Sequence, residues 1–165
     1  MPVTDITKDL DNRTLTLTAR FAAPVQRLWD LYADPRQIEQ VWGPPTYPAT
    51  FVQHELTPGS QTRYYMTSPE GEKFCGLWDI TSTDEPHGFT FIDSFADADF
   101  QPVGEMPSTE ATVCFTADGD ETVMTWTSVY ASAHDMQKVL DMGMEEGARQ
   151  ATNQIDDFLA RHPAA

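Results

Sequence analysis

Residues 132–159 read SAHDMQKVLDMGMEEGARQATNQIDDFL, and this stretch decides the fold. Ser132 and Asp135 resemble an N-terminal helix cap, and no proline follows before residue 159. The pattern therefore predicts one helix of about seven turns. Apolar and small residues share one face of this helix: Met136, Leu140, Gly143, Met144, Gly147, Ala151, Ile155 and Phe158. An amphipathic helix of this kind must lie on an apolar surface.

The residues before this helix predict a series of strands. Residues 13–21 alternate apolar and polar side chains, as a half-buried strand does. Further strand-like segments, separated by turn signals, are residues 50–56, 62–68, 73–81, 89–95, 111–116 and 122–131. Two short helices, residues 25–33 and 36–42, are expected between the first and second strands. Because hairpins dominate, we expect an α+β fold in which a curved antiparallel sheet wraps around the C-terminal helix.

Length and composition fit one ordinary domain. The chain has 165 residues, of which 40% are hydrophobic, enough for a sizeable core. We expect a single domain over residues 1–165, with its core at about residues 13–159. The longest apolar runs are a few residues, too short to span a bilayer, and the polar N-terminus is not a secretory signal. We therefore expect a cytoplasmic protein, either a monomer or a homodimer.

The charge balance excludes some partners. Ten basic and 26 acidic residues give a formal net charge of −16. Such a surface repels the phosphate backbone of nucleic acid and anionic membranes, so we expect neither as a partner. Two interpretations of the acidity remain open: a solvated surface that keeps the protein soluble, or a docking face for a basic partner.

The sequence shows no pattern typical of a metal, cofactor or catalytic site. Cys75 and Cys114 stand alone, without Cys or His neighbours at zinc-ligand spacing. We expect two reduced, buried thiols in strands and leave open whether they meet. The histidines show neither HxH nor HExxH spacing, and no GxSxG, Walker A or GxGxxG motif occurs. We therefore expect no metal, no cofactor and no identifiable catalytic residue.

Several short motifs resemble one superfamily. They are FAAP at 21–24 with LW at 28–29, WGP at 42–44, ELTPG at 55–59, Gly76 and Ile80 before FTF at 89–91, ETVM at 121–124, and MEEG at 144–147. In this order they resemble the START-type or birch-pollen-allergen-type helix-grip domains, in the branch related to the activator of heat-shock-protein-90 ATPase. The resemblance covers about residues 13–159. Ala148 stands where this branch often has Trp.

The resemblance implies a cavity between the C-terminal helix and the sheet. Gly143 and Gly147 remove side-chain volume from the inward helix face, although close helix-on-strand packing would explain them equally. Inward methionines suit either irregular core space or a ligand. Strand alternation and helix periodicity give the candidate lining residues: Tyr64, Met66, Trp78, Phe91, Asp93, Met124, Trp126, Tyr130, Met136, Leu140, Gly143, Met144 and Gly147.

Asp93 is the one candidate with acid–base chemistry. Alternation with Phe91 and Phe95 places it on the inner face of its strand, where burial would raise its pKa and make it an acid or a ligand anchor. If the register slips near the strand end, the carboxylate is instead solvated. Whether the Asp93 carboxyl group lies on the inner face or in solvent therefore tests its role as an acid or a ligand anchor.

Three functions remain open. The first is binding of a small hydrophobic molecule without chemistry. The second is an enzyme acting on a hydrophobic or aromatic substrate through Asp93, aided by Tyr64 or Tyr130. The third, implied by the family name, is a chaperone-associated docking module. The superfamily includes ligand binders, cyclases and co-chaperone domains, so the fold does not choose among these functions.

Overall fold

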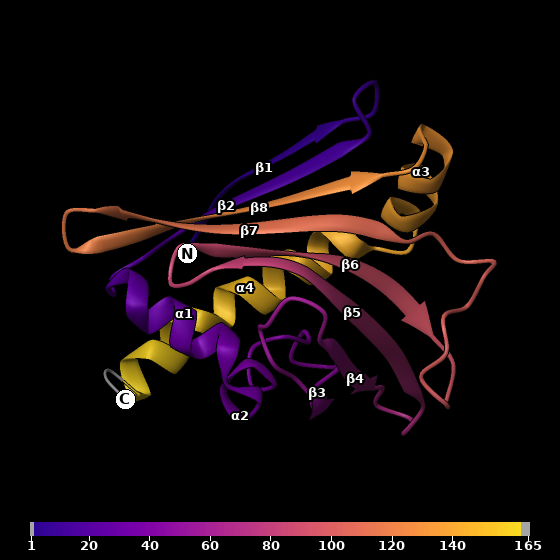
Figure 1. Cartoon of the computed structure of the whole chain (residues 1–165), viewed down its shortest axis with the longest axis horizontal. Coiled ribbons are helices and arrows are strands. Elements are labelled where there is room, and N and C mark those ends of the chain that lie inside the picture. Colours follow the sequence, from indigo (N-terminus) through magenta and orange to yellow (C-terminus); the bar gives the residue numbers. More distant parts are fainter. Residues whose placement is uncertain (1, 163–165) are drawn as a thin grey trace.

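The computed structural model describes residues 2–162, which form a sheet and four helices (Figure 1). The strands are β1 (Val3–Asp9), β2 (Thr14–Phe21), β3 (Ala49–Gln53), β4 (Gln61–Thr67), β5 (Lys73–Asp84), β6 (Gly88–Ala96), β7 (Thr109–Asp118) and β8 (Glu121–Tyr130). The helices are α1 (Val25–Ala33), α2 (Pro35–Ile38), α3 (Ala133–Asp141) and α4 (Met144–Arg161). Within these residues, no helix is long and apolar enough to cross a membrane.

The sheet is antiparallel throughout, with the strand order β1-β2-β8-β7-β6-β5-β4-β3. It bends around α4, which crosses its hollow (Figure 1). Alternation decides which side chains face α4: in β2, Leu15, Leu17, Ala19 and Phe21 are buried, and the residues between them are less so. The predicted α+β fold, a curved sheet around a C-terminal helix, is confirmed.

One strand was not predicted. β1 pairs with β2 from Val3 opposite Ala19 to Asp9 opposite Thr14, so the sheet begins well before residue 13. Its residues, VTDITKD, contain too few apolar side chains to show alternation. The backbone N–H of Val3 donates to Oδ1 of Asn153 at 3.2 Å, and this bond ties β1 to α4.

The prediction of one uninterrupted C-terminal helix is wrong. Ser132 does cap α3, because its hydroxyl accepts the N–H of Asp135 at 3.0 Å. The helix ends at Asp141, and α4 begins at Met144. Gly143 between them has a φ of +84°, a left-handed conformation that glycine adopts without strain. Gly143, for which the sequence left free volume and close packing equally open, therefore separates the two helices.

Two smaller predictions also need correction. The second short helix begins at Pro35 and ends at Ile38 rather than covering residues 36–42, because Asp34 caps it one residue earlier and Trp42 lies in the following loop. Both cysteines lie in strands and are free thiols, but only Cys75 is partly buried. Cys114 is exposed, because Val113 and Phe115 occupy the inner face of β7.

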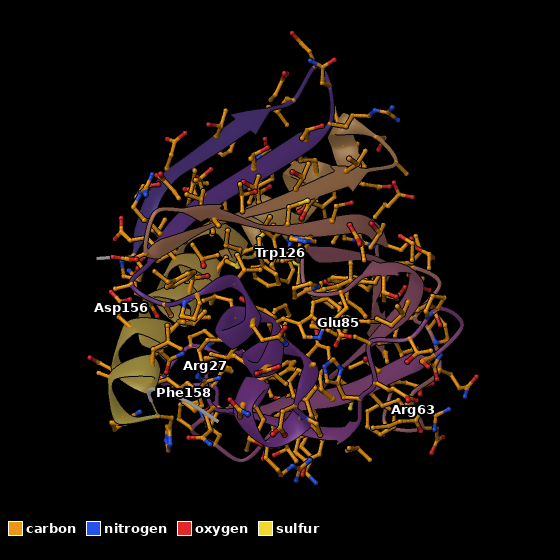
Figure 2. The ribbon with its side chains drawn as sticks, turned by 60° about the vertical axis from the view of Figure 1, so that its left-hand side comes forward. Arg27, Arg63, Glu85, Trp126, Asp156 and Phe158 are labelled. Atoms are coloured by element: carbon orange, nitrogen blue, oxygen red, sulfur yellow. The ribbon has the colours of Figure 1, made fainter. Side chains whose placement is uncertain are left out.

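α1 contacts the C-terminal end of α4 through a buried arginine. Arg27 of α1 is 5% exposed. Its guanidinium group donates to the carbonyl oxygen of His162 at 2.9 and 3.0 Å and lies 5.5 Å from the centre of the Phe158 ring (Figure 2). A cation at the C-terminal end of a helix is favoured by the helix dipole. This end of α4 is therefore closed by packing and by hydrogen bonds.

Candidate functional site

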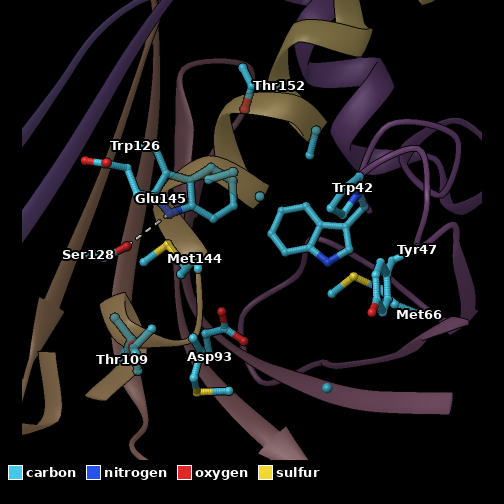
Figure 3. A pocket seen from close by; sticks show the side chains of 18 of the residues that line it. Trp42, Tyr47, Met66, Asp93, Thr109, Trp126, Ser128, Met144, Glu145 and Thr152 are labelled. Atoms are coloured by element: carbon cyan, nitrogen blue, oxygen red, sulfur yellow. Dashed lines mark hydrogen bonds between the residues drawn. The ribbon is translucent and has the colours of Figure 1, made fainter. Parts of the chain in front are cut away.

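A cavity of about 600 Å³ lies at the opposite end of α4 (Figure 3). Its walls come from the first half of α4, from the inner faces of the sheet, and from the loop between α2 and β3. Trp42, Pro44 and Tyr47 contribute the loop wall, and Phe74 and Met142 lie where the cavity opens to solvent. A volume of this size accommodates a small organic molecule.

The structure brings eight of the predicted lining residues to the cavity. They are Tyr64, Met66, Asp93, Trp126, Tyr130, Gly143, Met144 and Gly147. Among the others, Trp78, Phe91, Met124 and Met136 have no exposed surface, and Leu140 is partly buried against the small cluster around Tyr130. Strand alternation and helical periodicity assigned these residues to an inward face, but neither pattern tells which part of that face is covered by packed side chains.

Other lining residues were missed by the sequence analysis. Trp42 contributes most, since its ring lies 5.4 Å from that of Trp126 and 4.9 Å from that of Trp78. It sits in a loop, where no periodicity indicates an inward side chain. Ala148, which stands where the resembling family often has Trp, also lines the cavity. In the sequence, the replacement of that Trp by Ala148 was the one available signal for open space at residue 148.

Tyr64 reaches the cavity because the residue beside it is a glycine. Gly76 of β5 pairs with Tyr64 of β4, and any Cβ at residue 76 would overlap the Tyr64 ring and hydroxyl. The phenol therefore lies directly on the strand. Burial raises the pKa of Tyr64 and the charge of Asp93 raises it further, whereas the neighbouring indole N–H groups of Trp42 and Trp78 lower it. Neither indole N–H reaches hydrogen-bond geometry with a partner.

Asp93 points into the cavity rather than into bulk solvent (Figure 3). It is opposite Trp78 on β5 and Thr109 on β7, so the strand keeps its register at this residue. Burial raises the pKa of the carboxyl from 3.8 to about 7. Among residues 2–162, no donor makes a hydrogen bond to this carboxylate. Asp93 therefore lies on the inner face of β6, where its side chain is partly rather than fully exposed.

The polar groups that share the cavity with Asp93 are mainly hydroxyl groups. The pKa of Tyr130 is raised to about 12, mainly by burial and also by the charge of Asp93, while a hydrogen bond with Thr109 lowers it. Ser128 accepts the indole N–H of Trp126 at 3.2 Å. The described part of the chain contains no group of three His, Cys, Asp or Glu side chains that could hold a metal ion. The arrangement suits binding of an apolar body with one polar contact.

Comparison with known proteins gives both a family and relatives of known structure. The model of the family described as Activator of Hsp90 ATPase homolog 1-like protein matches residues 22–160. The crystal structure of protein Ms6760 from Mycobacterium smegmatis is 55% identical, with a TM-score of 0.90, over 96% of this chain and 97% of that one. A solution structure of a protein from Arthrobacter aurescens is 44% identical, with a TM-score of 0.92, over 96% and 92%. The search of curated proteins gave no match.

A more distant relative agrees in fold. The crystal structure of the AHSA1 protein from Silicibacter pomeroyi has a TM-score of 0.74 at 17% identity, over 90% of this chain and 99% of that one. At this identity the likeness concerns the fold alone. The family match, however, extends from the end of β2 almost to the end of α4, and so includes most of the cavity wall.

Proposed function

The chain belongs to the family of Activator of Hsp90 ATPase homolog 1-like proteins, and we propose that it binds a small hydrophobic ligand in the cavity beneath the first half of α4. The observation that supports this proposal is the open volume of about 600 Å³ inside a mainly apolar wall. Protein interiors are normally packed to crystal-like density, so the side chains that line this solvent-open space lack protein contacts on one side. A ligand that fills the space restores those contacts.

The helix sequence supports the proposal. Gly147 and Ala148 face the cavity, and a Cβ built on Gly147 meets only the Pro44 ring, at 3.8 Å. An added methyl group at residue 147 would therefore fit without clashing with the backbone and would reduce the open volume. The small side chains therefore leave usable space beneath the helix.

Filling the cavity tests this function. We expect Ala148→Trp to place an indole in the open space and to weaken binding of the neutral dye Nile red by about tenfold or more. Fluorescence titration measures the affinity. Ala160→Trp is the matched control, because Ala160 lies on the same helix but is exposed, and it should leave binding unchanged. Absence of saturable binding to the unmodified chain, or equal affinity for both variants, would contradict the proposal.

An enzyme is the second candidate, favoured by the position of Asp93 in the cavity. Its pKa of about 7 would allow proton transfer near neutral pH. Tyr64 and Tyr130 are the nearby hydroxyl groups, but burial raises the pKa of each, so neither supplies a ready base. With one poised group and no orienting partner, the cavity favours binding over catalysis.

The interaction partner and the cellular compartment of the protein are further proposals. A chaperone partner, which the family name suggests, would use the acidic exterior, and a pull-down with the heat-shock-protein-90 homologue tests it. We expect a monomer or homodimer, and the two free thiols support a cytoplasmic location.

A further inference from the structure

The wall of the cavity carries negative charge and no positive charge. Asp93 and Glu145 are its acidic members, and none of the lining residues is Lys, Arg or His. Glu145 is already paired, because its carboxylate lies 3.2 Å from Nζ of Lys8 and both side chains reach solvent. Asp93 has no such partner among residues 2–162. The cavity therefore holds one unpaired carboxyl group in apolar surroundings.

An unpaired carboxylate in such a place is unfavourable unless a ligand compensates it. Transfer of a charge from water to an apolar site is unfavourable, and a partner of opposite charge recovers part of that cost. The raised pKa of Asp93 reflects the same penalty. A ligand that brings a cation to this carboxylate would remove the penalty at the moment it binds.

The surroundings of Asp93 also favour a cation. Trp42 and Trp126 lie across the same open space as Asp93 (Figure 3), and aromatic ring faces attract ammonium groups. The formal net charge of −16 raises the local concentration of cations and repels anions. A fatty acid would bring a second negative charge to Asp93 without any basic residue to receive it.

Building on the proposed function, we propose that the ligand is a hydrophobic amine whose ammonium group pairs with Asp93 while its apolar body fills the space beneath Gly147 and Ala148. The class is defined by one protonated amine at the end of an aliphatic or aromatic body. Asp93 is then the residue that sets specificity, since it is the unpaired charged group in a mainly apolar wall.

A matched series of ligands tests this inference. Octylamine, 1-octanol and octanoate share one alkyl chain and differ in the charge of the head group. Calorimetric titration at about pH 8 and about 0.15 M salt keeps the amine protonated and screens the exterior charge. We expect octylamine to bind about tenfold or more tightly than octanol, and octanoate to bind most weakly.

Two variants separate Asp93 from the general acidity of the chain. Asp93→Asn should weaken octylamine by about tenfold while leaving octanol as tight as before or tighter. Asp99→Asn removes the same charge from an exposed loop side chain and should keep the order of the unmodified protein. A loss of octylamine affinity confined to Asp93→Asn supports the inference.

The opposite results overturn it. If octanol or octanoate binds as tightly as octylamine, or if the two Asn variants behave alike, the ligand is not selected by its ammonium group. If Nile red binds saturably and octylamine does not, the amine inference fails while ligand binding stands. If Nile red, octanol and octylamine all fail to bind, the proposed function itself fails.

Discussion

The two halves of α4 perform different tasks with the same helix face. In the second half, Ile155, Phe158 and Leu159 are buried and join the main core. In the first half, Gly147 and Ala148 face the same way but leave an open cavity. The difference lies in side-chain volume rather than in polarity. The comparison teaches that amphipathic periodicity places a helix on a sheet, whereas residue size decides whether core or cavity forms beneath it.

The sharpest test of this comparison is truncation of an apolar residue in each half. Phe158 is 1% exposed, so Phe158→Ala should lower the free energy of unfolding by about 3–5 kcal/mol through lost burial and a new void. Met144 faces space that is already open, so Met144→Ala should cost about 1 kcal/mol or less. Urea denaturation followed by tryptophan fluorescence measures both. Equal losses would mean that the first half of α4 is packed as tightly as the second.

A second test uses the charge of Asp93, which faces the cavity beneath the first half of α4. Because the folded pKa of Asp93 is raised from 3.8 to about 7, the folded state binds more protons than the unfolded state between these values. Stability should therefore fall as pH rises from about 4 to about 7 and then level off. Three pH units correspond to at most about 4 kcal/mol.

Asp93→Asn isolates this contribution. The variant should be more stable than the unmodified chain at about pH 8, by roughly 2–4 kcal/mol, and equally stable at about pH 4. Urea denaturation at both pH values measures the difference. Asp99→Asn, in a solvated loop, should show no comparable pH-dependent gain. An Asp93→Asn variant that is destabilised at pH 8 would show that the carboxylate has a favourable partner in the folded state.

These contrasts show what the sequence can predict. Period-two alternation in β2 and β8 and helical periodicity near the C-terminus were enough for the fold class, since burial of one face dictates both patterns. Alternation also placed Asp93 on the inner face, although it could not exclude solvation at the strand end. Seven of the eight lining residues were found because they lie on strands or on α4, whose inward side is fixed by period, whereas Gly143 lies in the break between α3 and α4.

The rest depends on contacts that have no local pattern. β1 has few apolar residues and is held by pairing with β2 and by a bond to α4, both of which are distant in sequence. Trp42 turns inward from a loop. Trp78 and Phe91 share the inner face with Tyr64 and Asp93, yet they lie in packed core. The boundary between core and cavity depends on where α4 and the loop after α2 lie over the sheet.

The last test concerns Gly143, the residue between α3 and the first half of α4. Gly143 has a φ of +84°, so Gly143→Ala should destabilise the chain by about 1 kcal/mol, although no atom lies within 4 Å of the added Cβ. Gly147 is helical and its added Cβ meets only Pro44 at 3.8 Å, so Gly147→Ala should stabilise the chain by up to about 1 kcal/mol. Thermal unfolding of the pair gives shifts of opposite sign. A neutral or stabilising Gly143→Ala would mean that α3 and α4 can merge into the single helix that the sequence pattern predicts. The cavity beneath the first half of α4 would then depend on small side chains alone and not on a break between α3 and α4.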